Sequence, residues 1–70
     1  MKKFWCGSAP HHCDICGEVF NTVFIDGKWM GRAWANMCQE CHTNSGGKLG
    51  LGIGQRYEVQ PDGKWLKTGG

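Results

Sequence analysis

The sequence predicts a small α+β domain that a bound metal ion holds together. Three observations point to it: two Cys-x-x-Cys pairs, two turn signals between β-prone segments, and a length of only 70 residues. The pairs are Cys13 with Cys16, and Cys38 with Cys41. Each pair turns two thiolates toward one point, and two pairs supply the four soft ligands of a tetrahedral zinc site. We therefore expect one Zn²⁺ per chain, bound by these four cysteines.

Disulfide or redox chemistry and unligated thiols are the alternatives for these cysteines. The apolar run that follows the two lysines at the start ends at Gly7, and it is far shorter than the apolar core of a signal peptide. No segment approaches the roughly 20 apolar residues of a membrane helix. We therefore expect a cytoplasmic protein without a membrane partner. Thiols stay reduced in that compartment, which favours metal binding over disulfides.

The small size of the chain also favours a metal. A domain of 70 residues buries little apolar surface and usually needs a further constraint to be stable. Its 12 glycines raise the conformational entropy that folding must overcome. Metal binding would offset this cost, so we expect the metal-free chain to be loose or unfolded.

The chain divides into a lead segment, residues 1–12, and a single zinc-binding domain, residues 13–70. In the lead segment, the aromatic pair Phe4 and Trp5 can pack back on the domain. Gly17 follows the first cysteine pair directly, and it relieves the tight turn in which backbone N–H groups point at sulfur.

A first hairpin is expected between the cysteine pairs. Residues 21–25 are rich in β-branched and aromatic side chains and end at Asp26-Gly27, which is a typical hairpin turn. Residues 28–37 should return as the second strand and bring the second cysteine pair beside the first. Trp29 and Trp34 are the core candidates of this strand.

A short helix and a second hairpin should follow. Residues 42–45 predict one or two helical turns that end at the glycines 46–47. Residues 55–67 predict a hairpin with its turn at Pro61-Asp62-Gly63. A cysteine pair, a hairpin and a second pair opening a short helix is the order of a treble-clef fold, and a zinc ribbon is the alternative. The expected fold is thus two β-hairpins and at most one short helix around one zinc.

Four motifs together carry a family resemblance. They are the first cysteine pair, the segment 24–28, the segment 34–42 that contains the second pair, and the glycine-rich tail 50–57. With these motifs the chain resembles small zinc-ribbon-like proteins encoded by tailed bacteriophages, over about residues 13–67. The resemblance implies an accessory protein that works inside the infected cell, in a family whose role is generally unknown.

Four further residues have metal-binding side chains: Cys6, His11, His12 and His42. We expect Cys6 to be an ordinary free thiol, because a second metal would need more ligands than the lead segment provides. His42 follows Cys41 directly, so its side chain should point away from the shared metal, toward the surface or the surroundings of the site. His11 or His12 could replace one cysteine, but four well-spaced thiols make that unnecessary.

The glycine-rich segment 46–54 does not match a nucleotide-binding loop. It lacks the Gly-Lys-Ser/Thr ending of a phosphate loop, and its glycines are not spaced as in a dinucleotide-binding fingerprint. Leu49, Leu51 and Ile53 alternate with glycines. The segment is either a connector whose aliphatic side chains fill the core, or a surface that another chain or ligand approaches closely.

Ligand chemistry favours a binding protein over an enzyme, and the charge of the zinc form provides no long-range field toward nucleic acid. The formal charge is +2, and four thiolates with one Zn²⁺ lower it by two, to near zero. Four cysteines close the coordination shell, whereas catalytic zinc keeps an open position. The His-x-Glu signature of zinc deaminases is absent, and no small-molecule substrate is evident. We therefore expect no enzymatic activity.

Three functions remain open. The first is binding to nucleic acid, or to a host protein that processes it, through a basic and aromatic surface. The second is binding to another host factor through the glycine-rich segment and the terminal aromatics. The third is electron transfer by a rubredoxin-like iron site, although Gln39 and His42 depart from that pattern. The expected nucleic-acid-binding residues are Lys48, Arg56, Tyr57, Lys64, Trp65 and Lys67.

Overall fold

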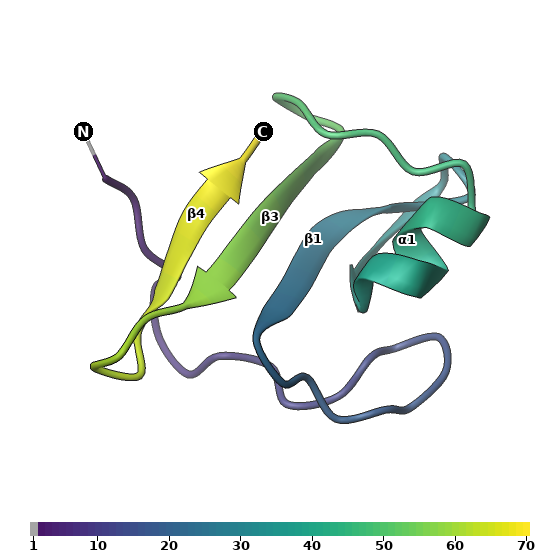
Figure 1. Cartoon of the computed structure of the whole chain (residues 1–70). Helices are drawn as coiled ribbons and strands as arrows, with labels where there is room; N and C mark the ends of the chain where they lie inside the picture. Colours follow the sequence, from purple (N-terminus) through teal and green to yellow (C-terminus); the bar gives the residue numbers. More distant parts are fainter. Residues whose placement is uncertain (1) are drawn as a thin grey trace.

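The computed structural model describes residues 2–70 (Figure 1). The strands of this part form one antiparallel sheet in the order β2-β1-β3-β4, and helix α1 packs against β1 and β2. The expected small α+β fold is confirmed, but the two hairpins are not separate, because β1 also pairs with β3. The elements are β1 (Val23–Trp29), β2 (Ala33–Met37), α1 (Gln39–Asn44), β3 (Gly54–Val59) and β4 (Trp65–Gly69).

The first hairpin turns at residues 30–32, so the predicted turn at Asp26-Gly27 is wrong. Asp26 and Gly27 lie inside β1, where they pair with residues of both β2 and β3. The turn is closed by the N–H of Arg32, which donates to the carbonyl of Trp29 at 3.0 Å. Met30 and Gly31 both have positive φ, 55° and 69°, which is the backbone of a tight hairpin turn.

Gly27 has a packing role in place of the expected turn role. An added Cβ at this position would lie 3.4 Å from the Cα of Gly54 on the neighbouring strand. The two glycines face each other in the β1–β3 register, so they let these strands come together with little side-chain bulk between them. A strong local turn signal is therefore overridden by sheet pairing.

The second hairpin turns where the sequence predicts. Within Pro61-Asp62-Gly63, the Asp62 carboxylate accepts a hydrogen bond from the Lys64 N–H at 2.9 Å, and Gly63 has φ +86°. The turn is closed by the N–H of Gln60, which donates to the carbonyl of Lys64 at 2.7 Å. Asp and Gly therefore supply the side-chain acceptor and the positive φ that favour such a turn.

Phe24 is the centre of the core. Its side chain is 0% exposed, and four aromatic rings surround it at centroid distances of 4.9 to 5.3 Å. Offset-stacked and edge-to-face rings of this kind add to the stabilisation from burial. The four rings belong to Trp5, Phe20, Tyr57 and Trp65.

Trp29 and Trp34 are not core residues, which corrects the expectation from the sequence. Their side chains are 39% and 48% exposed. Trp34 lies on the edge strand β2 opposite Lys28, and Trp29 ends β1 next to the turn. The core is filled instead by Trp5 and Phe20, which come from outside the first hairpin.

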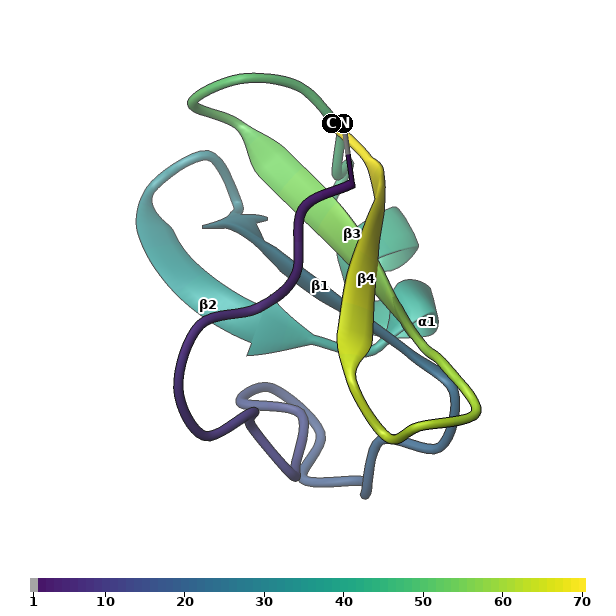
Figure 2. The ribbon, with the colours of Figure 1, turned by 90° about the vertical axis from the view of Figure 1, so that its left-hand side faces the viewer.

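Both edges of the sheet are partly covered by the chain itself. Figure 2 shows the N-terminal segment running alongside β4, where Phe4 forms a β-bridge with Leu66. At the opposite edge, the backbone of Asp14 bonds to Asn36 of β2. Covered edges limit pairing with other chains. Within residues 2–70, no helix has the length and apolar character needed to cross a membrane.

Candidate metal centre

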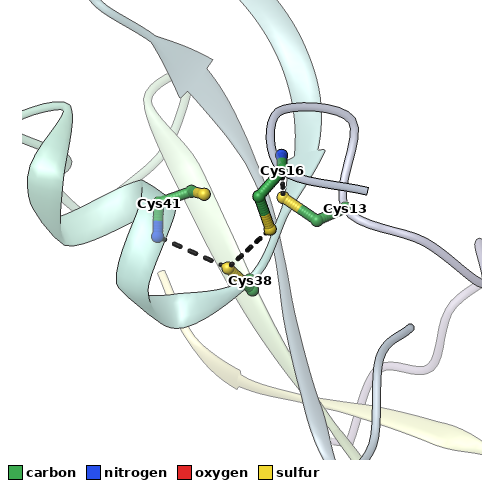
Figure 3. Close-up of side chains that lie close together, drawn as sticks. All are labelled: Cys13, Cys16, Cys38 and Cys41. Atoms are coloured by element: carbon green, nitrogen blue, oxygen red, sulfur yellow. Dashed lines mark hydrogen bonds between the residues drawn. The ribbon is translucent and has the colours of Figure 1, made fainter. Parts of the chain in front are cut away.

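The four predicted cysteines lie together (Figure 3). Their sulfur atoms all lie within 4.8 Å of one another, and the Sγ atoms of Cys16 and Cys38 are 3.9 Å apart. Zn–S bonds of about 2.3 Å in a tetrahedron place the sulfurs about 3.8 Å apart. The cluster thus has the ligand type, number and spacing of a structural tetrathiolate metal site.

A tight turn presents the first cysteine pair. The N–H of Gly17 donates to the carbonyl of Cys13 at 2.9 Å, and the N–H of Cys13 donates to the carbonyl of Glu18 at 2.8 Å. Gly17 has φ +80°, so the expected relief of the turn by glycine is confirmed. The N–H groups of Ile15 and Cys16 point at the Cys13 sulfur, at 3.4 and 3.5 Å.

The second pair joins strand β2 to helix α1. Cys38 is the N-cap of the helix, and its sulfur accepts a hydrogen bond from the Cys41 N–H at 3.4 Å. The helix begins at Gln39, earlier than the predicted residues 42–45, and its last residue is Asn44. One side chain therefore satisfies a free N–H of the first helical turn and belongs to the thiol cluster.

The surroundings divide the thiols into more and less acidic ones. Burial raises the pKa of the Cys13 thiol, but backbone hydrogen bonds from Cys16, Cys38 and Ile15 outweigh it and lower the pKa to about 6. At Cys41, the hydrogen bond with Cys38, burial and the neighbouring thiols raise the pKa. N–H groups that stabilise a thiolate before metal binding also stabilise it as a ligand.

Asp14 ties the first pair to the sheet, a role that the sequence analysis missed. Its N–H donates to the carbonyl of Asn36, and its carboxylate accepts from the Asn36 N–H, both at 2.8 Å. The turn that carries Cys13 and Cys16 is thereby fixed to β2, two residues before Cys38. The sequence shows an Asp directly after the first cysteine of the pair, but it does not indicate that this Asp bonds to Asn36, which is distant in the sequence.

The other metal-type side chains of residues 2–70 lie outside the thiol cluster. Cys6, His11 and His12 are exposed. His42 is only 3% exposed, so it is not a surface residue. Its Nε2 lies 3.2 Å from the Lys48 carbonyl, and the ring packs so closely on Gly47 that a Cβ there would collide with it. His42 thus anchors the glycine-rich segment to helix α1.

The glycine-rich segment leaves its aliphatic side chains exposed. Leu49, Leu51 and Ile53 are 40%, 91% and 44% exposed, so of the two alternatives the connector whose aliphatic side chains fill the core does not match the structure. Two reciprocal hydrogen bonds between Gly50 and Gly54, at 2.8 and 3.0 Å, hold the loop that presents Leu51. The segment is thus an ordered loop with an apolar tip.

The structure separates the predicted nucleic-acid-binding residues into groups. Arg56 and Tyr57 are neighbours on β3, so their side chains point to opposite faces of the sheet. Tyr57 stacks on Phe24, whereas Arg56 donates to Thr68 at 3.2 Å and lies 3.9 Å from the Glu58 carboxylate.

Three of the four remaining predicted residues adjoin the N-terminal segment, and the fourth does not. Lys64 and Trp65 line a groove together with Phe4. The backbone of Lys67 bonds to Lys3, at 2.7 Å. Lys48 lies in the glycine-rich segment, where its carbonyl contacts His42. Lys3 and Phe4 were missed as site residues, because only the pairing with β4 places them there.

Comparison with known proteins identifies no relative of the chain. No protein-family model matches it, and no curated protein or solved structure is significantly similar to it. The resemblance to phage proteins therefore stays a prediction.

Proposed function

We propose that the chain is a zinc-stabilised module that binds nucleic acid and has no enzymatic activity of its own. In the phage setting that the sequence resemblance implies, it would act in the host cytoplasm. The observation that carries the proposal is the pairing of Phe4 with Leu66, which brings lysines from the two ends of the chain together along the β4 edge of the sheet.

Zinc has a structural role in this proposal. Four thiolates would fill the tetrahedral shell and leave no position for a substrate or an activated water molecule. The opening of helix α1 at Cys38 favours the treble-clef arrangement over the zinc ribbon. The metal would hold the first turn, the end of β2 and the start of α1 together, and thereby fix the sheet on which the binding surface is built.

The basic surface consists of Lys3, Lys64 and Lys67. The Lys67 N–H donates to the Lys3 carbonyl at 2.7 Å, and the Lys64 ammonium lies 5.9 Å from the centre of the Phe4 ring. Among the described residues, none of these three lysines forms an ion pair with a carboxylate. Unpaired ammonium groups beside aromatic rings are suited to phosphates and neighbouring bases.

The test is a titration of the zinc-loaded protein with a fluorescent mixed-sequence oligonucleotide at several salt concentrations. We expect affinity that falls steeply with salt, because phosphate contacts release counterions. Reversal of charge at Lys3, Lys64 and Lys67 should weaken binding and flatten its salt dependence. Reversal at Lys28, Arg32 and Lys48, which lie outside this surface, is the matched control with the same change in net charge. Absence of binding at low salt would refute the proposal.

A second candidate function is binding to a host protein, and one observation favours it. Ile15, Trp29 and Met30 are 41%, 39% and 59% exposed, and they line a shallow hollow of about 220 Å³ beside helix α1. Exposed aromatic and methionine side chains are enriched at protein interfaces. Retention of a host protein that is lost in Trp29→Ser and Met30→Ser variants would favour this function.

A further inference from the structure

The groove beside the basic surface has a more specific use. We infer that it holds an unpaired base of a single-stranded nucleic acid, an inference that rests on the proposed function and names the form of its ligand. The groove lies between the N-terminal segment and the turn that precedes β4, and its walls are aromatic. It is lined by Phe4, Trp5, Gly7, Ala9, Gly63, Lys64 and Trp65.

The size and the walls of the groove suit a planar ring. Its volume is about 440 Å³, which is within the range of small-ligand sites. Phe4 is 41% exposed and lies on the backbone bridge to Leu66, whereas Trp5 and Trp65 are half-buried and held by contacts with Phe24, and all three line the groove. Gly7 and Gly63 add no side chains, and an added Cβ at either would meet no atom within 4 Å. Aromatic faces held in this way stack on bases with little dependence on sequence.

The charge at the rim suits the phosphate that follows the base. Lys64 lines the groove, and its ammonium lies near the Phe4 ring. Lys3 and Lys67 line the adjoining surface along β4. The carboxylate of the turn, Asp62, accepts a hydrogen bond from the backbone N–H of Lys64. The site thus offers aromatic faces for the base and ammonium groups for the backbone, which is the combination found in single-strand binding sites.

A second hollow extends the groove past Trp65. It has a volume of about 470 Å³ and shares Ala9 and Trp65 with the first hollow. Phe20 and His11 are among its other lining residues. Two hollows that adjoin at Ala9 and Trp65 can receive two successive bases of one strand.

A duplex does not fit this site in the same way. The faces of paired bases are stacked on one another inside the helix, so they cannot contact Phe4 or Trp65 unless the bases are flipped out, which costs unstacking energy. A duplex would still contact the lysines through its phosphates. If bases enter the groove, the protein should prefer single strands to duplex. If the lysines only attract phosphates, it should show no such preference.

The test compares a single-stranded oligonucleotide with the duplex of the same sequence, using the zinc-loaded protein. We expect the single strand to bind at least about tenfold more tightly, as expected from one or more base–aromatic stacks. Ala9→Leu adds a side chain inside both hollows and should weaken single-strand binding about tenfold while duplex binding stays unchanged. Ala33→Leu adds the same bulk at an exposed position of β2 and should change neither.

A spectroscopic measurement supports the test if Ala9→Leu folds poorly. The double variant Trp29→Phe and Trp34→Phe keeps Trp5 and Trp65 as its tryptophans, and the single strand should quench their fluorescence. Equal affinity for single strand and duplex, with no quenching, would overturn base insertion and leave the proposed function intact. Failure of both nucleic acids to bind at low salt would refute the proposed function and this inference together.

Discussion

The sulfur of Cys38 accepts a hydrogen bond from the backbone N–H of Cys41 at 3.4 Å, so the first turn of helix α1 and the metal cluster share one side chain. The helix has only six residues, and isolated helices of that length are unstable in water. Its stability must therefore come from the sheet beneath it and from the metal. Formation of the helix and binding of the metal are expected to be one event.

Serine substitutions in the second pair remove a metal ligand but leave the helix cap in place. Serine is a good N-cap, so Cys38→Ser loses a thiolate and keeps a cap acceptor, and Cys41→Ser loses a thiolate without changing the cap. Structural zinc contributes on the order of 10 kcal/mol, against about 1 kcal/mol for a cap. Both variants should therefore lose most of their helical circular dichroism and zinc. A Cys38→Ser protein that melts like the wild type would contradict this account.

Met30 should be the least favourable residue of the first turn. Its φ of 55° lies in the left-handed region, which costs a non-glycine residue about 1 to 2 kcal/mol. Met30→Asn should stabilise the protein by about 1 kcal/mol, because asparagine tolerates this conformation. Gly31→Ala should destabilise it by a similar amount, since φ is 69° there. Urea unfolding at a fixed free zinc concentration measures both, and a destabilised Met30→Asn variant would show that the turn has a different backbone.

Asp26 should make stability depend on pH. Burial raises the pKa of this carboxyl above its ordinary value of 3.8, so the folded state disfavours the ionised form. Ionisation of Asp26 therefore destabilises the folded protein. This destabilisation is absent at a pH below 3.8 and fully present at a pH above the raised pKa. Asp26→Asn should therefore stabilise the protein at pH 7, and the difference should shrink as the pH falls toward 4.

Melting temperatures of the wild type and the variant across this pH range measure the effect of Asp26. Loss of zinc in acid affects both proteins alike, so only the difference between them is informative. Glu18→Gln removes one carboxylate at an exposed position and is the control for the change in net charge. A stability difference between Asp26→Asn and the wild type that does not depend on pH would exclude the carboxyl as its source.

The metal cluster and the second hairpin could be predicted from the sequence because their signals are local. Two Cys-x-x-Cys turns can converge on only a few geometries, and Pro61-Asp62-Gly63 carries both the acceptor and the glycine that its turn uses. The first hairpin shows the limit of the same reasoning. Asp26-Gly27 has an equally good local signal, but pairing with β3 keeps these residues in the strand.

The candidate binding surface could be predicted only in part, because it depends on contacts between distant segments. Lys64 and Trp65 were expected, but Lys3 and Phe4 join them only through the bridge to Leu66. The same contacts decide which aromatics are buried. Trp5 packs against Phe24 in the core, whereas the expected core tryptophans of the first hairpin, Trp29 and Trp34, are exposed. Nothing in the spacing of these residues indicates that the N-terminal segment runs along β4.

The central claim is that Cys13, Cys16, Cys38 and Cys41 bind one zinc ion on which the fold depends, and native mass spectrometry with elemental analysis tests it directly. The wild type should carry one zinc per chain and be colourless. Cys6→Ser should keep the same zinc content and melting temperature, since this exposed thiol lies outside the cluster. A red protein that contains iron, a folded protein without metal, or a Cys6→Ser protein with less zinc would contradict the claim.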